Sequence, residues 1–409
     1  MNFIIVILTL LWLFFLARLV FPWISLIRHS VQCFFSERHP YQKRHREFCR
    51  HYAPQGQSYS LREWDSILLN AWAEEEPIPT HCPESFTPQA FVNWIKLFPL
   101  RKIFLPSSEG HCVPTLERTA GDSKDPCYGF LHGIWDSSMG FFPVAYYLWR
   151  LHQGRVCFIF QEMPGHGAYN TTSESLTLSF TYPQLAELIG LRLSGKALEE
   201  NGKTIPAVSA VTLFGNSMGG AVCLIALARF PQYIQSAIPI NPAIVPQKEL
   251  PSIFRLTRWS TPSLMRLFLA YFLADVGLKQ ISSSHLHALP DKPMGLSRFQ
   301  HWHRYAYIHH PLFPFVALKV AKDLLAMHGD SVLFQKILSE LQTIPTGKIF
   351  LINGQDDIWL DIEAMPKIIT QQWKMSIRYL LLKNAGHCAH CDQPEKIAKA
   401  VFQWQNTSL

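Results

Sequence analysis

The sequence predicts an α/β protein with a mostly parallel central sheet, helices on both faces, an inserted helical region and an N-terminal transmembrane helix. Short apolar runs alternate with longer helical patterns from residue 101 onward, as expected for βαβ units. Residues 247–346 show mainly helical patterning with aromatic-rich runs. The first 28 residues are almost wholly apolar.

The N-terminal segment predicts a single-pass membrane anchor over residues 1–28. Residues 3–16 form the run FIIVILTLLWLFFL, and the apolar character continues to residue 27 with Arg18 as its one charge. A helix of about twenty residues crosses a hydrocarbon layer of about 30 Å. A cleaved signal peptide is the alternative, but no basic residue precedes the run and no small-x-small cleavage site follows it.

Basic residues dominate the sequence after this segment. Arg28, Arg38, Lys43, Arg44, Arg46 and Arg50 are opposed only by Glu37 and Glu47. Since positive charge stays on the cytoplasmic side of a membrane, the rest of the chain is predicted to lie in the cytoplasm. A solvated basic linker is the alternative, and in either case the segment can attract anionic headgroups. Residues 29–100 are predicted as a juxtamembrane segment with helical pieces, including residues 61–76.

Composition narrows the class of the folded part. With 409 residues, 48% of them hydrophobic and 16% charged, the chain can bury one large core. No helix-turn-helix, zinc-finger or aromatic RNA-binding signature accompanies the formal net charge of +7, so we expect no nucleic-acid partner. The 9 cysteines lack the regular spacing of a disulfide-stapled domain, which favours a reducing compartment.

The predicted core has two parts, residues 101–246 and 347–409. Its strands are predicted over residues 127–131, 155–160, 210–214, 237–240, 348–353 and 377–382, and its helices over residues 141–151, 221–229 and 395–404. Residues 247–346 interrupt this alternation and are predicted to form a helical cap, because ligands bind beyond the carboxyl ends of strands in open α/β sheets. A surface bundle without a ligand-binding role is the alternative.

The strongest motif is G-x-S-x-G at Gly215-Asn216-Ser217-Met218-Gly219, between a predicted strand and a predicted helix. A nucleophile on such a sharp turn needs small neighbours on both sides so that strand and helix can approach. The N-terminus of the following helix also favours a developing oxyanion. The motif predicts that Ser217 is a nucleophile.

Further motifs in the expected order make residues 101–404 resemble the α/β-hydrolase superfamily, in its lipase and esterase branch. His132-Gly133-Ile134 matches the oxyanion loop of that family, which implies backbone N–H donors at Ile134 and Met218. The resemblance also implies a triad in the order serine, acid, histidine.

A turn after the fourth strand adds to the resemblance. Pro164-Gly165-His166-Gly167 matches the family's turn, although Glu162 stands where aspartate is commoner and Tyr169 where serine is. These departures are predicted to affect only a structural turn, and His166 is predicted to be structural.

The acid and base of the implied triad follow the last two predicted strands. The family's G-x-x-D spacing selects Asp357 within Gly354-Gln355-Asp356-Asp357, with Asp356 as the alternative. Gly386-His387 supplies the base. A neutral imidazole with a pKa near 6.5 can take the serine proton, and the carboxylate fixes its tautomer.

A cluster of histidine and cysteine begins at the predicted base, in His387-Cys388-Ala389-His390-Cys391. A zinc site or a redox dithiol is the alternative role for this cluster. Its ligands are too crowded for one tetrahedral ion, and no second C-x-x-C exists, so we expect no metal and no cofactor. His301, His303, His309 and His310 of the predicted cap are likewise expected to be surface or packing residues.

The resemblance implies hydrolysis of a carboxylic ester or thioester through an acyl-serine intermediate. The aromatic cap and the membrane anchor favour a lipid-like substrate delivered from the membrane. A carbon–carbon bond hydrolase or an acyltransferase could use the same triad. A catalytically silent membrane scaffold, with the cap as its docking surface, is the alternative from another class.

Overall fold

The computed structural model describes residues 61–76, 78–79, 81–106, 112–134, 136–166, 178, 180–244, 261–262, 313–357 and 359–407. The predicted membrane anchor and most of the predicted cap, including its four histidines, lie outside these residues. No helix among the described residues has the length and apolar character needed to span a bilayer.

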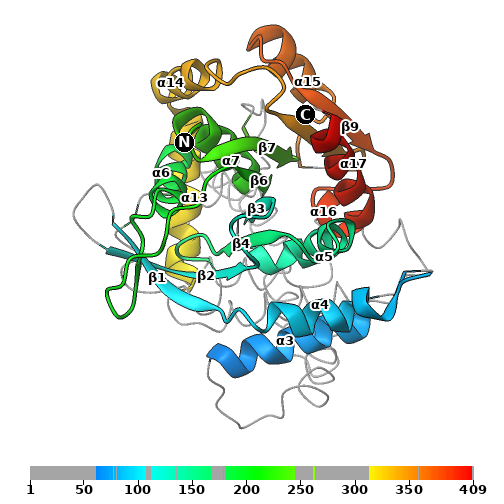
Figure 1. The fold of residues 1–409 in the computed structure, drawn as a ribbon. Helices are drawn as coiled ribbons and strands as arrows, with labels where there is room; N and C mark the ends of the chain where they lie inside the picture. Colours follow the sequence, from blue (N-terminus) through cyan, green and yellow to red (C-terminus); the bar gives the residue numbers. More distant parts are fainter. Residues whose placement is uncertain are drawn as a thin grey trace, which may run out of the picture.

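The described strands form one nine-stranded sheet in the order β5-β1-β2-β4-β3-β6-β7-β8-β9 (Figure 1). Their bounds are β1 Arg101–Pro106, β2 Cys112–Ala120, β3 Cys127–Leu131, β4 Cys157–Gln161, β5 Leu198–Glu199, β6 Val211–Asn216, β7 Ile234–Ile240, β8 Phe350–Gly354 and β9 Arg378–Leu382. All neighbours from β4 to β9 pair in parallel, whereas β1, β2 and β5 pair antiparallel. The predicted mostly parallel sheet is confirmed, and the antiparallel strands are additions to it.

Strand β2 was not predicted because charged residues interrupt its apolar pattern. Glu117 is fully buried there, and both nitrogens of the Arg192 guanidinium edge donate to its carboxylate. Burial alone would raise the pKa of Glu117, but the charge and hydrogen bonds of Arg192 hold that pKa below its ordinary value. The ion pair therefore allows a carboxylate inside the core.

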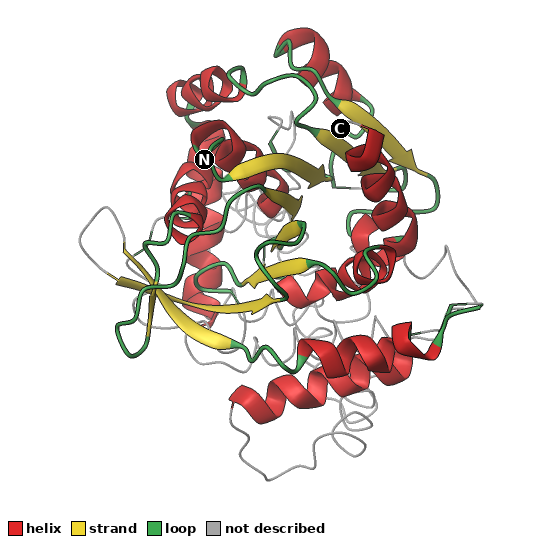
Figure 2. Cartoon of the chain, in the orientation of Figure 1, coloured by secondary structure: helices red, strands yellow, loops and turns green. Residues whose placement is uncertain are grey.

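Helices cover both faces of the sheet, as Figure 2 shows and as the sequence predicts. The longer ones are α3 Leu61–Glu75, α4 Pro88–Ile95, α5 Phe142–Leu151, α6 Tyr182–Leu193, α7 Met218–Arg229, α13 Phe313–Gly329, α14 Ser331–Leu341 and α17 Pro394–Thr407. Shorter helical segments are η1 Glu84–Phe86, η2 Ser138–Phe141, α15 Ala364–Lys367, η4 Ile368–Gln372 and α16 Ala389–Asp392.

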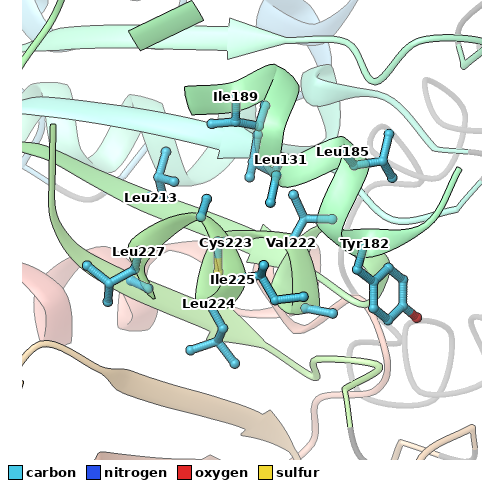
Figure 3. Close-up of a cluster of buried hydrophobic side chains, with 14 of the residues drawn as sticks. Leu131, Tyr182, Leu185, Ile189, Leu213, Val222, Cys223, Leu224, Ile225 and Leu227 are labelled. Atoms are coloured by element: carbon cyan, nitrogen blue, oxygen red, sulfur yellow. The ribbon is translucent and has the colours of Figure 1, made fainter. Parts of the chain in front are cut away.

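The core is divided by the sheet into two apolar layers. Tyr128 and Phe130 of β3 face a layer that includes α3, α4, α5 and α17. Cys127 and Leu131 of the same strand face α6, α7, α13 and α14, and Figure 3 shows the α6–α7 part of this layer. The side chains of β3 therefore contribute to both layers in turn, because successive side chains along a strand point to opposite faces of the sheet.

The helices α3 and α4, from the predicted juxtamembrane segment, belong to the folded body. Trp72 of α3 makes edge contacts with Phe91 of α4 and Tyr146 of α5, at ring centroid distances of 5.6 and 5.8 Å. Asp65 of α3 also forms an ion pair with Arg118 of β2. These contacts attach the start of the described chain to both the sheet and α5 (Figure 1).

Candidate active site

Ser217 lies in a strained turn between β6 and α7. Its φ of 52° and ψ of −113° fall in a backbone region that residues other than glycine rarely adopt. A Cβ added at Gly215 would lie 2.1 Å from Gly219 O, and one added at Gly219 would lie 2.1 Å from Leu131 O. Both positions therefore require glycine, for the close approach that the sequence motif predicts.

The loop after β3 lies directly beside this turn. A Cβ added at Gly133 would be 3.4 Å from Ser217 Cβ and 3.2 Å from Asn216 Oδ1. Within the described part of the chain, the N–H groups of Ile134 and Met218 donate to no other residue. The two amides predicted as oxyanion donors are thus free to bind an oxygen atom near Ser217.

His387 follows β9 and pairs with a buried carboxylate that follows β8. Its Nδ1 lies 2.8 Å from Asp357 Oδ2, and the Asp357 side chain is wholly buried. The other carboxylate oxygen accepts from the N–H groups of Trp359 (2.7 Å) and Leu360 (3.2 Å). Asp356 is exposed, so it is Asp357 that contacts the histidine.

Two buried asparagines join the loops that bear these residues. Asn216, which precedes Ser217, donates through Nδ2 to His387 O at 2.8 Å. Asn241 donates to Gly386 O (2.8 Å) and His387 O (2.9 Å), and its Oδ1 accepts from Gly354 N (2.9 Å). Residue 241 directly follows a strand predicted over residues 237–240, but nothing in a single sequence shows which distant carbonyls a buried amide meets.

Ser217 and His387 are brought to the same end of the sheet but are not hydrogen-bonded to each other. In the described chain, the Ser217 hydroxyl donates to neither His387 nor another residue. Catalytic hydrogen bonds often shorten only when substrate binds. The structure therefore shows the contact between Asp357 and His387, whereas a hydrogen bond between Ser217 and His387 would form only on substrate binding.

The remaining histidine and cysteine residues near the site are packed among other groups. His166 is fully buried, and burial together with neighbouring His132 lowers its pKa to about 3, so it is neutral at physiological pH. His390 stacks on Phe141 at 4.3 Å between ring centroids, and Cys391 Sγ lies 3.5 Å from Gly140 O. Among the described residues, no group of three His, Cys, Asp or Glu side chains is placed to hold a metal ion.

Comparison with known proteins identifies a family. The model of the Alpha/beta hydrolase family matches residues 130–400. No curated protein sequence matches the chain significantly.

Solved structures share the fold at low identity. A membrane phospholipase A, described as a novel bacterial virulence factor, has a TM-score of 0.53 and 19% identity over 75% of this chain and 86% of its own. A 2-hydroxy-6-oxo-6-phenylhexa-2,4-dienoate hydrolase from Rhodococcus sp. strain RHA1 has a TM-score of 0.52 and 13% identity, and the match covers 76% of this chain and 99% of that hydrolase. A carboxylesterase of the thaumarchaeon Nitrososphaera gargenis has a TM-score of 0.51 and 18% identity, and the match covers 74% of this chain and 98% of that esterase.

The bridging role of Asn241 predicts a measurable loss of stability. Asn241→Ala leaves Gly386 O and Gly354 N without this partner, and we expect the free energy of unfolding to fall by about 1–3 kcal/mol for each buried group left unpaired. Asn384→Ala is the matched control, because Asn384 is exposed and both asparagines have positive φ, 43° and 56°. Denaturant unfolding measures both variants, and equal losses would contradict the bridging role.

Proposed function

The chain belongs to the alpha/beta hydrolase family, and from this premise we propose that it is a serine hydrolase that cleaves a carboxylic ester or thioester. Ser217 is the nucleophile, His387 the general base and Asp357 the residue that orients His387. The observation that supports this proposal most directly is the 2.8 Å contact between His387 Nδ1 and the buried carboxylate of Asp357, in a loop bonded to the residue before Ser217.

The proposed reaction proceeds in two steps. Ser217 Oγ attacks the substrate carbonyl while His387 Nε2 takes its proton, and Asp357 stabilises the resulting imidazolium. The N–H groups of Ile134 and Met218 bind the oxyanion of the tetrahedral intermediate. His387 then gives the proton to the leaving group, and water, deprotonated by His387, releases the acid from the acyl-serine.

A lipid-like substrate is the second part of the proposal. The N-terminal apolar segment, the aromatic residues of the predicted cap and the likeness of fold to a membrane phospholipase A support it. We also propose that residues 1–28 anchor the protein as a single-pass membrane protein, with the hydrolase in the cytoplasm.

Active-site labelling tests the nucleophile. A fluorophosphonate is expected to label the wild-type protein covalently, and Ser217→Ala is expected to abolish labelling because it removes the hydroxyl that the proposed triad activates. Ser194→Ala, at a half-buried serine whose hydroxyl donates to Leu191 O at the end of α6, is the control and should label normally. A well-folded wild-type protein that does not label would favour the silent scaffold.

Substitution of the two adjacent aspartates tests the assignment of the acid. We expect Asp357→Asn to lower kcat by about 10⁴-fold, since the asparagine amide disfavours the tautomer of His387 that accepts the serine proton. Asp356→Asn should keep nearly full activity, because Asp356 is exposed and away from the imidazole contact. Hydrolysis of a p-nitrophenyl ester measures both, and the reverse order of effects would assign the role to Asp356.

Protease protection tests the topology. In intact cells that express the full chain, a C-terminal tag is expected to resist added protease and to be digested once the membrane is permeabilised, because the basic residues after residue 28 keep the hydrolase inside. Digestion of the tag in intact cells would overturn the cytoplasmic assignment.

A further inference from the structure

The carbonyl of Gly133 is held in a fixed direction by two hydrogen bonds. His132 Nδ1 lies 2.7 Å from Gly133 O, and the N–H of Asp136 donates to the same oxygen at 3.2 Å. No cis peptide bond occurs in the described chain. In a trans peptide the C=O and the next N–H point in opposite directions. Holding Gly133 O therefore sets the direction of the Ile134 N–H, the proposed oxyanion donor.

The contacts of the His132 ring assign its proton. The ring is fully buried, and Met163 N donates to His132 Nε2 at 2.9 Å. A nitrogen that accepts a hydrogen bond carries no proton, so the neutral ring carries its proton on Nδ1. That proton is the one that Gly133 O accepts. Burial disfavours a charged ring, but the neighbouring Glu162 carboxylate outweighs burial and raises the pKa of His132 above its ordinary value. A second proton would go to Nε2, so Nδ1 keeps its proton in both forms of the ring. Asp136 and His166 are the other ionisable groups near the ring in the described chain.

Glu162 contacts both ends of the loop that contains Ile134. Its Oε2 lies 3.3 Å from His132 Nε2. Its Oε1 accepts from Ser137 Oγ (2.7 Å), Ser138 Oγ (2.7 Å) and Ser138 N (3.1 Å), at the start of η2. The carboxylate is 5% exposed and sits on the residue after β4. Glu162, directly after β4, therefore fixes the Ser137–Ser138 end of the loop by hydrogen bonds and lies beside the His132 end.

We propose that His132 and Glu162 are positioning residues for the oxyanion site: His132 aims the Ile134 N–H through the Gly133 carbonyl, and Glu162 fixes the far end of the loop at Ser137 and Ser138. The inference rests on the proposed function. It gives a chemical role to Glu162, which the sequence predicts only as part of a structural turn. Both side chains are buried, so the proposal assigns neither of them a contact with the substrate.

This role differs from a purely structural one in what it changes. An oxyanion donor interacts with charge that exists only near the transition state, so a misdirected donor slows the chemical step without weakening ground-state binding. A substitution that only weakens packing lowers the free energy of unfolding, but the molecules that remain folded react at the wild-type rate.

The test compares two substitutions of His132: one keeps the contact that Nδ1 makes with Gly133 O, and the other keeps the contact that Nε2 makes with Met163 N. His132→Asn places an amide near the Nδ1 position and can still donate to Gly133 O. His132→Gln reaches the Nε2 position and can still accept from Met163 N, but it leaves Gly133 O without its side-chain donor. Full-length protein reacts with a fluorophosphonate at several concentrations, which separates the limiting rate of phosphonylation from the half-saturating concentration.

We expect the limiting rate to fall by about 10²–10³-fold in His132→Gln, as for the loss of an oxyanion donor, with the half-saturating concentration unchanged. His132→Asn should keep most of the rate. Glu162→Asp, which withdraws the carboxylate from Ser137 and Ser138, should be slower than Glu162→Gln, which keeps its length. His152→Gln is the control, since this half-buried histidine contacts Tyr128 instead, and it should react at the wild-type rate.

The outcomes separate this inference from the proposed function. Folded wild-type protein that is not phosphonylated overturns both. Normal reaction of the wild type, together with a wild-type limiting rate in His132→Gln, overturns the inference alone. If the His132 variants do not fold, the Ser137→Ala/Ser138→Ala double variant replaces them, because it removes two donors to Glu162 and keeps His132. A reduced limiting rate supports the inference, and an unchanged one overturns it.

Discussion

The convergence of Ser217, Asp357 and His387 at one end of the sheet depends on three places where two backbone segments approach too closely for a Cβ atom to fit between them. At Gly215 and Gly219 the strand β6, the helix α7 and the end of β3 meet, and at Gly354 the turn after β8 meets Gly386 O at a would-be Cβ distance of 2.3 Å. The first two contacts put the oxyanion loop beside Ser217, and the third puts Asp357 beside His387. Residues far apart in the sequence can converge because glycine at these positions lets the backbone segments approach without a clash.

Buried polar side chains then fix what the close contacts bring together. Asn241 donates to the loop of His387 and accepts from the end of β8, and Glu162 holds the oxyanion loop at Ser137 and Ser138. Such groups are costly to bury unless their hydrogen bonds are satisfied, so each favours one arrangement over its alternatives. The site is therefore supported by side chains anchored at the ends of β4 and β7, on the rigid sheet and not on the loops alone.

The parallel strands could be predicted because each is a short, continuous apolar run followed by a turn, as in β3 and β6. The β2 strand could not, since Glu117 suits the core only when Arg192 lies beside it, and that pairing is a tertiary fact. The family's G-x-x-D spacing after β8 favoured Asp357 and left Asp356 as the alternative, and the contact with His387 distinguishes the two. The contacts of Asn241 and Glu162 depend on carbonyl and hydroxyl groups from distant segments, and a single sequence carries no signal of them. The membrane anchor stays a prediction.

Ser217 illustrates a conflict between folding and chemistry at one residue. With φ at 52° it costs the folded state about 1–3 kcal/mol, which a glycine at the same position would largely recover. Selection for thermostability alone would thus favour loss of the hydroxyl. A directed-evolution screen of this protein for heat resistance should accordingly score turnover in the same round, because its most robust survivors can be inert.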